Sequence, residues 1–195
     1  MRLFLTLLGG SALFLILLFL TGSIDLNIER QADTVPPEVP PGQSSAPEET
    51  EEETSLSELY INEGLGFEIN HPPAWSVDEF EQAVSLTDES GSGAVTVIVN
   101  PAPEGATLAG IAALSRAQFE EQFNTAIPPP ESLNINGRQS LGFVFNFTAN
   151  ERGFSGLFYS LMAGDRVYGI MGVVNSDAAR LASVNAMALT FKVLD

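Results

Sequence analysis

The sequence contains no cysteine, and it has only one lysine, one histidine and one tryptophan among its 195 residues. Without cysteine the chain can form no disulfide, no thiolate nucleophile, no cysteine-ligated zinc site and no acylated N-terminal cysteine. A single histidine, His71, leaves a transition-metal centre without the three or four convergent ligands that it needs. We therefore expect no metal ion and no cofactor.

Positive charge is also scarce, because eight Lys and Arg residues face 25 Asp and Glu residues, a formal net charge of −17. Residues 58–195 hold sixteen of these acids and six of the basic residues, which is a net charge of −10. A nucleic acid would be repelled by such a surface, and no basic stripe is present to release its counterions. The composition excludes nucleic acid as a partner and disfavours binding of this region to an anionic lipid surface.

One long hydrophobic run is present, and it covers residues 3–20. About 20 apolar residues span the hydrocarbon layer of a bilayer as a helix, whereas the apolar part of a cleaved signal is about 7–15 residues long. Residues 21–23, Thr-Gly-Ser, are a poor cleavage site. We expect an uncleaved signal-anchor helix within residues 1–24. A cleaved signal and a buried core helix are the alternatives.

The charges around this run predict its orientation. Arg2 precedes it, and the acidic residues Asp25, Glu29 and Asp33 follow it with only Arg30 among them. The positive-inside rule then places the N-terminus in the cytoplasm. Everything after residue 24 would lie outside the cytoplasm, in a periplasmic, extracellular or lumenal space, with the membrane contacted through residues 3–20.

Residues 25–57 have the composition of a disordered linker. The segment 31–57 contains five prolines, many Glu and Ser residues and almost no large apolar side chain. Ordering it would cost backbone entropy without any compensating burial. We expect a solvated spacer that the acidic run 48–53 stiffens by self-repulsion. Binding of calcium or of a basic partner by this run is the alternative.

Residues 58–195 alternate between strand and helix patterns. Period-two hydrophobicity bounded by Gly, Asn and Pro predicts strands at 59–62, 67–70, 82–88, 94–100, 132–136, 139–149, 154–162 and 166–174. Apolar residues four apart predict a helix over 108–127, which Thr107 caps and Pro128 stops. A second helix is expected from Asp177, with Ser176 as its cap. The fold class is therefore α+β, an antiparallel sheet flanked by amphipathic helices.

The opening of this domain resembles the PsbP-like superfamily. The resemblance lies in Tyr60, the run Gly66–Asn70, Pro72 and Trp75, together with the central helix, the hairpins and the closing Thr190–Phe191. It implies an α/β/α sandwich and a non-catalytic accessory or assembly role. The chain departs from the photosystem II subunit of that superfamily because it has a membrane anchor and Lys192 as its only lysine. No binding residue is carried over, and docking to photosystem II does not follow.

No catalytic constellation is visible. His71 lies in an Asn-His-Pro-Pro segment that ends a strand, and no Gly-x-Ser-x-Gly elbow exists. The nearest match, Gly153-Phe154-Ser155-Gly156, fails at Leu157. We expect His71 to be a structural or surface residue, so His71→Ala should change little, whereas Trp75 should fill the core edge and Trp75→Ala should loosen the domain.

Three other polar segments are better explained by structural than by functional roles. Asp88–Gly93 spaces oxygen ligands like a calcium loop, but the position of the bidentate acid is Val99, and a hairpin turn is favoured. Glu120–Glu121 is expected to be a solvated helix face. Asn146-Phe147-Thr148 is a glycosylation sequon inside an expected strand, relevant only in a eukaryotic secretory route.

The leading functional hypothesis is a membrane-tethered, extracytoplasmic, non-catalytic binding or assembly domain with a protein partner. The second is a small-ligand or lipid-binding domain, in which the side chains of Phe143, Phe145 and Phe147 line a pocket. The third is a hydrolase that uses carboxylates alone, since sixteen acids could supply a pair. A closed core without a cavity would argue against the second hypothesis, and the absence of clustered buried acids would argue against the third.

Overall fold

The computed structural model describes residues 55–194. The expected anchor and all but the last three residues of the expected linker therefore lie outside the described residues. Neither described helix is long and apolar enough to cross a membrane.

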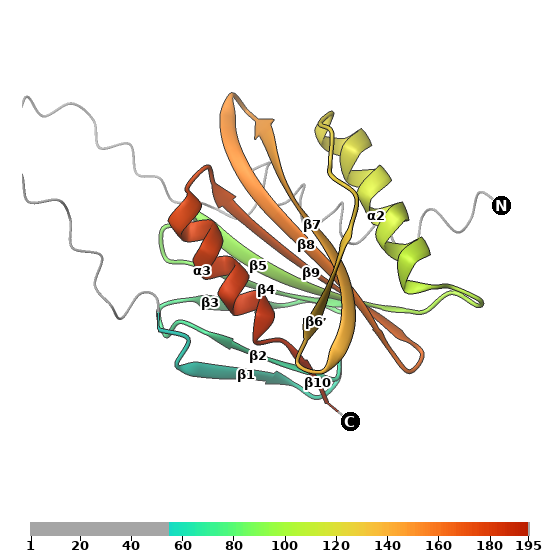
Figure 1. Cartoon of the computed structure of the whole chain (residues 1–195). Coiled ribbons are helices and arrows are strands. Elements are labelled where there is room, and N and C mark those ends of the chain that lie inside the picture. Colours follow the sequence, from blue (N-terminus) through green and yellow to red (C-terminus); the bar gives the residue numbers. More distant parts are fainter. Residues whose placement is uncertain (1–54, 195) are drawn as a thin grey trace, which may run out of the picture.

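The described chain forms ten strands and two helices (Figure 1). Seven antiparallel strands make the large sheet in the order β3-β4-β5-β9-β8-β7-β6. Their bounds are β3 Ser76–Glu79, β4 Ala83–Thr87, β5 Gly93–Pro101, β6 Glu131–Ile135, β7 Arg138–Ala149, β8 Arg152–Ala163 and β9 Arg166–Asn175. A small antiparallel sheet has the order β1-β2-β10, with β1 Glu58–Asn62, β2 Phe67–His71 and β10 Lys192–Val193.

Tight turns fix the register of the long hairpins. Asn136 and Gly137, between β6 and β7, have φ angles of 47° and 85°, the left-handed backbone of a two-residue hairpin turn. Asn150 and Glu151, between β7 and β8, have φ angles of 50° and 64°. Both turns lie where the sequence predicts them, and the α+β fold class with its antiparallel sheet is confirmed.

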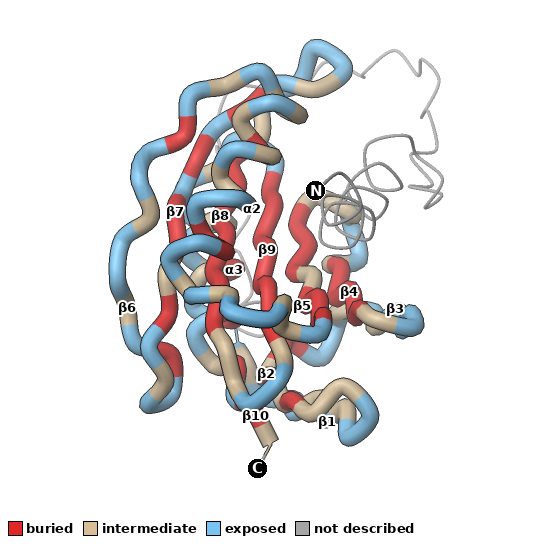
Figure 2. The backbone as a smooth tube through the Cα atoms, turned by 90° about the vertical axis from the view of Figure 1, so that its right-hand side faces the viewer, coloured by how far each residue is buried: buried red, intermediate tan, exposed pale blue. Residues whose placement is uncertain are grey.

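The two helices cover opposite faces of the large sheet (Figure 1). The helix α2, Leu108–Phe123, packs on β7 and β8, and the helix α3, Ala178–Leu189, packs mainly on β9 and β5. The small sheet shares the α3 side, because Phe67, Ile69 and Phe191 belong to the same core as the α3 residue Met187. Figure 2 shows buried residues along the central strands β5, β8 and β9, with more exposed residues at the edge strands β1, β3 and β6.

The α2 helix begins as expected but ends early. Thr107 Oγ1 accepts a hydrogen bond from the Gly110 N–H at 3.1 Å. The predicted continuation to Ile127 is wrong, because Asn124 adopts a left-handed backbone with φ 47°, which terminates a helix. Ile127 is still buried in the core, and its N–H donates to Glu120 Oε1 at 3.1 Å.

The cap of α3 is also one residue away from its expected position. Asp177, rather than Ser176, accepts hydrogen bonds from the N–H groups of Ala179 at 2.9 Å and Arg180 at 3.4 Å. Ser176 is instead held by the sheet, because its N–H donates to the Gly153 carbonyl at 3.1 Å.

Two short strands, β3 and β10, have no counterpart in the sequence prediction. Three of the four β3 residues are exposed, so the strand shows no hydrophobic alternation. The two residues of β10 pair with Glu68 and Phe67 of β2, a contact that no local pattern reveals. Tyr60 of β1 donates to Glu79 of β3 at 2.6 Å and so ties the two sheets together. Burial and this acceptor raise the pKa of Tyr60 to about 12.

Candidate functional site

A small pocket opens where the start of α3 meets the β4–β5 turn and the β2–β3 loop. Its volume is about 210 Å³. Its lining residues are Ala74, Trp75, Asp88, Glu89, Ser90, Gly93, Val174, Ala179, Arg180, Ser183 and Val184. We call it the Trp75 pocket. It joins an apolar floor to a polar rim that comes mostly from the turn and the helix.

The β4–β5 turn is built around Asp88. The Asp88 N–H donates to the Gly93 carbonyl at 3.0 Å, and the Asp88 carbonyl accepts from the Gly91 N–H at 2.9 Å. Asp88 Oδ1 accepts from the Ser92 N–H at 2.8 Å and from Ser90 Oγ at 3.0 Å. The hairpin interpretation of residues 88–93 is confirmed. The carboxylate that a calcium loop would offer to the ion is held by donors of the turn itself.

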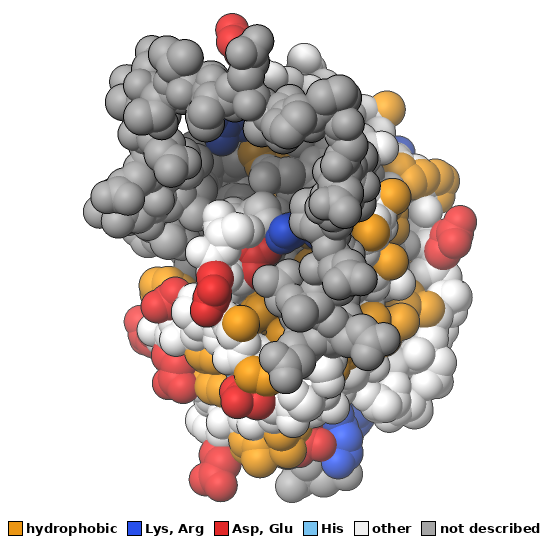
Figure 3. All heavy atoms as spheres, turned by 90° about the vertical axis from the view of Figure 1, so that its left-hand side faces the viewer, with side chains coloured by type: hydrophobic (Ala, Val, Ile, Leu, Met, Phe, Trp, Pro, Cys, Tyr) orange, Lys and Arg blue, Asp and Glu red, His pale blue; other side chains and the backbone are white. Residues whose placement is uncertain are grey.

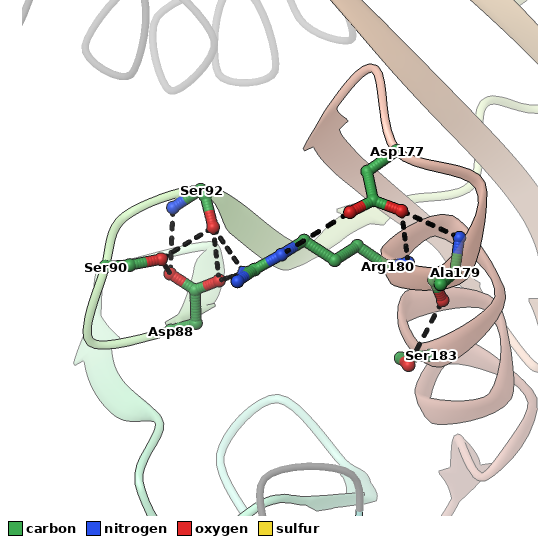
Figure 4. A network of polar contacts seen from close by, with 7 residues as sticks. All are labelled: Asp88, Ser90, Ser92, Asp177, Ala179, Arg180 and Ser183. Atoms are coloured by element: carbon green, nitrogen blue, oxygen red, sulfur yellow. Dashed lines mark hydrogen bonds and ion pairs between the residues drawn. The ribbon is translucent and has the colours of Figure 1, made fainter. Parts of the chain in front are cut away.

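Arg180 links this turn to α3 (Figure 4). Its Nη1 donates to Asp88 Oδ2 at 2.7 Å and also contacts Ser92 Oγ. Its Nε lies 3.9 Å from Oδ2 of Asp177. The Arg180 side chain is 40% exposed and the Asp88 side chain 13% exposed. The guanidinium therefore lies between two carboxylates, which leaves the local charge balance negative.

Trp75 forms the other wall. It lies in the loop between β2 and β3, where its N–H donates to the Pro72 carbonyl at 3.1 Å. A methyl group at Gly93 would lie 3.8 Å from Trp75 Cη2 and 3.2 Å from Asp88 Oδ2, so the ring lies beside the turn. Trp75 is half-buried against the core rather than fully enclosed by it. The expectation that it fills the core edge is therefore only partly met, because part of its ring faces the pocket.

The pocket does not bring His71 and its own serine hydroxyls together. Within residues 55–194, no group of three His, Asp or Glu side chains could hold a metal ion. His71 does not line the pocket. It is buried, and its Nδ1 lies 2.9 Å from the Pro72 carbonyl oxygen. The hydroxyls of Ser90 and Ser92 donate to the Asp88 carboxylate at 3.0 Å each, rather than to an imidazole base.

The other residues singled out from the sequence have structural roles. Ser155 Oγ donates to Asn146 Oδ1 at 2.8 Å across the β7–β8 pair, and Asn146 of the sequon is exposed on β7. Phe143, Phe145 and Phe147 are buried. They pack against rings that include Phe119 of α2 at centroid distances of 4.1–5.9 Å. These three side chains belong to the core, and Phe147 also lines a shallow hollow beside the end of α2.

The solvated-face interpretation fits Glu121, which is exposed, but describes Glu120 only in part, because its partly exposed carboxylate is hydrogen-bonded within the domain. Glu120 Oε1 accepts from the Ile127 N–H at 3.1 Å and from Arg116 Nη2 at 2.9 Å. The Ile127 amide and then the Arg116 guanidinium hold the pKa of the Glu120 carboxyl below its usual value. Glu120 thus holds the chain segment that follows α2.

Sequence reasoning did not identify Arg180 or Asp177 as part of a site. Arg180 and Asp88 are 92 residues apart, so no motif spacing could connect them. The available signal was weak: a hairpin turn rich in side-chain acceptors, and a single arginine in the first turn of a helix that otherwise contains no charged residue.

Comparison with known proteins identifies the fold of the domain but no close relative in sequence. No protein-family model matches the sequence, and no curated protein matches it. Cyanobacterial PsbP (CyanoP) from Synechocystis sp. PCC 6803 is similar in structure with a TM-score of 0.58 at 15% identity, over 70% of this chain and 91% of that one. The Ran-binding protein Mog1p of Saccharomyces cerevisiae is similar with a TM-score of 0.54 at 11% identity, over 71% of this chain and 95% of that one.

LpqN of Mycobacterium tuberculosis, described as involved in cell envelope biogenesis, gives a TM-score of 0.50 at 7% identity, over 66% of this chain and 83% of that one. At these identities the likeness concerns the fold alone. The resemblance seen in the sequence is confirmed at that level: residues 55–194 have the PsbP-like (Mog1/PsbP) fold.

Proposed function

We propose that this protein is a membrane-tethered, non-catalytic binding or assembly domain that acts on a protein partner outside the cytoplasm. The Trp75 pocket is the observation that carries the proposal. It offers a half-exposed tryptophan beside a polar turn that is hydrogen-bonded within itself, the type of anchor position that dominates protein interfaces. A Ran-binding protein among the similar structures supports a protein as the partner.

The pocket's size favours a protein side chain over a small molecule. Pockets for drug-sized ligands usually measure about 300–1,000 Å³, whereas the Trp75 pocket measures about 210 Å³. One inserted side chain fills such a volume. Two other hollows reach about 610 and 530 Å³. They are shallow basins with mostly polar linings, and neither suits a lipid.

The tether belongs to the proposal because of the sequence. The apolar run 3–20 supplies the anchor, the charge asymmetry around it supplies the orientation, and residues 25–57 supply the spacer. The tether would then keep the domain near the membrane surface. This raises the effective concentration of the domain for a partner in or near that membrane.

Site-specific photo-crosslinking in cells tests the partner claim. A crosslinking residue in place of Ser183, on the rim of the pocket, should capture a protein. The same residue in place of Glu121, exposed on α2 at the opposite sheet face, is the matched control. Equal capture from both positions, or none from Ser183, would refute a partner at the pocket.

Reporter fusions test the location. A reporter that is active only outside the cytoplasm, fused after Asp195, should give signal. Activity of a cytoplasm-only reporter at that position would reverse the proposed topology.

A further inference from the structure

We infer that the Trp75 pocket receives one basic side chain, an arginine or a lysine, from the protein partner. This inference rests on the proposed function and names the chemistry of the contact. It would make Glu89 and Trp75 the residues that determine what the pocket accepts.

The charges at the rim favour a cation. Asp88 and Asp177 flank the Arg180 guanidinium, and Glu89 lines the same pocket as Asp88 and Arg180. The wider surface has the same sign, because residues 58–195 carry a net charge of −10. In Figure 3, acidic side chains predominate over basic ones on the described part of the face that forms the left side of Figure 1. Such a field draws in a basic segment and repels an acidic one.

Glu89 is the carboxylate that is free to receive the cation. It is exposed, and no hydrogen bond or ion pair to it is found among residues 55–194. Asp88 is different, because its two oxygens already accept from four donors: Ser90 Oγ, the Ser92 N–H, Ser92 Oγ and Arg180 Nη1. Asp88 therefore shapes the rim, while Glu89 can form a new charge-assisted hydrogen bond.

The floor of the pocket matches the aliphatic part of the same side chain. The Trp75 ring, Val174 and Val184 are apolar surfaces along which the methylene groups of arginine or lysine can lie. A cation placed over the face of a tryptophan ring is also attracted by its quadrupole. A long side chain with a charged tip therefore satisfies both the floor and the rim.

Arg180 does not make the pocket a receptor for acids. Its Nη1 is held by Asp88 and Ser92, and its Nε lies beside Asp177. An incoming carboxylate would have to compete with both aspartates. A second copy of this domain is an unsuitable partner for the same reason, because two strongly acidic surfaces repel each other.

The single tryptophan provides a direct measurement. The chain contains only one Trp, so its fluorescence reports on the pocket without interference. The full-length protein in detergent is titrated with four blocked tripeptides, Ac-Gly-X-Gly-amide, where X is arginine, lysine, citrulline or glutamate. Citrulline has nearly the shape of arginine without its charge. We expect saturable fluorescence changes with the arginine and lysine peptides, and we expect high salt to weaken the binding of both. The citrulline and glutamate peptides should cause no change.

Two matched variants locate the contact. Glu89→Gln should weaken binding of the arginine peptide about threefold, the size expected for one exposed ion pair. Glu121→Gln removes the same charge from α2 and should leave binding unchanged. Thermal melting checks that both variants remain folded.

Each contrary outcome overturns the inference in a recognisable way. Binding of the glutamate peptide would show that Arg180 accepts anions after all. Equal binding of citrulline and arginine peptides, or no effect of Glu89→Gln, would remove the role of charge. If no peptide binds but the Ser183 crosslink still captures a protein, the basic side chain is refuted while the proposed function stands.

Discussion

The two faces of the large sheet are closed by different means. On the α2 face, phenylalanine rings of the helix and of β7 and β8 contact one another in edge-to-face or tilted arrangements at centroid distances of 4.1–6.0 Å. On the other face, α3 and the small sheet cover an aliphatic core, and the beginning of α3 is fixed by the Asp88–Arg180 contact. Aromatic rings supply most of the packing on the α2 face, where Glu120 and Arg116 hold the chain that follows the helix. The face on which a polar contact fixes the start of the helix is the one with the Trp75 pocket.

The largest expected effect lies on the α2 face. Phe119 is 4% exposed and contacts Phe123, Phe143, Phe145 and Phe158. Phe119→Ala should lower the free energy of unfolding by about 3–5 kcal/mol, because the sheet cannot collapse into the space left behind. Chemical denaturation measures this loss. Leu114→Ala on the same helix is the control, since Leu114 is 38% exposed and its truncation should cost much less. Equal losses in both variants would mean that rings do not seal this face.

A clash tests the α3 face. A methyl group at Gly172 of β9 would lie 2.3 Å from Val184 Cγ1 and 3.0 Å from Leu157 Cγ. Gly172→Ala should therefore lower the free energy of unfolding by about 1–3 kcal/mol, because α3 must move away from the sheet.

Two companion variants sharpen that experiment. Adding Val184→Ala should restore part of the loss, since the two side chains compete for one space. Gly64→Ala should be nearly neutral, because its nearest neighbour, Asn62 Oδ1, would lie 3.5 Å away. A Gly172→Ala protein of unchanged stability would show that α3 is only loosely seated.

Variants at Trp75 and His71 compare the stability cost of truncating a pocket residue with that of truncating a core residue. Trp75 is half-buried, so Trp75→Ala should cost about 1–2 kcal/mol. His71 is 5% exposed, and its removal should cost at least as much, about 1–3 kcal/mol. This order reverses the one expected from the sequence. Thermal melts of both variants decide it: unfolding of the Trp75→Ala domain would restore the sequence expectation and make the pocket wall part of the core.

The smallest effect concerns Glu120 and depends on pH. Its pKa in the folded domain lies below the usual value of a glutamate, so the folded state favours the charged form. The stabilisation is present above the unfolded pKa and is lost as the pH falls through the folded pKa. Glu120→Gln should therefore lower the melting temperature slightly at pH 7 and have less effect at the acidic end. Melting curves from pH 7 to pH 3 test this, and a larger effect in acid would contradict the assigned sign.

Local patterns were enough to predict most of this fold. The alternation in residues 139–149 and the Asn136–Gly137 turn predicted their hairpin, because side-chain period and turn chemistry are written in neighbouring residues. The early end of α2 was missed because Asn124 ends the helix four residues before Pro128, the obvious stop signal. Because α2 ends early, the chain turns back toward the sheet and the Ile127 N–H reaches Glu120. That hydrogen bond depends on the tertiary path of the chain, which local patterns do not reveal.

The candidate site was less accessible to such reasoning. In the sequence, Asp88 and Ser90 indicated only a weak calcium-loop match, and Trp75 indicated a core residue and a part of the PsbP-like resemblance. Their partner Arg180 comes from a different element, 92 residues from Asp88, and it is brought there by the packing of α3 on β9 and β5. A surface made by three separate segments has no signature in the order of residues along the chain.

The pairing of β10 with β2 has a consequence for how the domain forms. It joins Lys192 and Val193 to Glu68 and Phe67, and the Asn136 side chain reinforces it by donating to the carbonyls of Leu189, Thr190 and Phe191. Contacts between such distant positions slow folding, because the loop-closure entropy is lost before they form. During synthesis, the small sheet therefore cannot be completed until residue 193 has left the ribosome. A chain that must be threaded through a membrane before it folds, as we propose for this one, gains from such a delay.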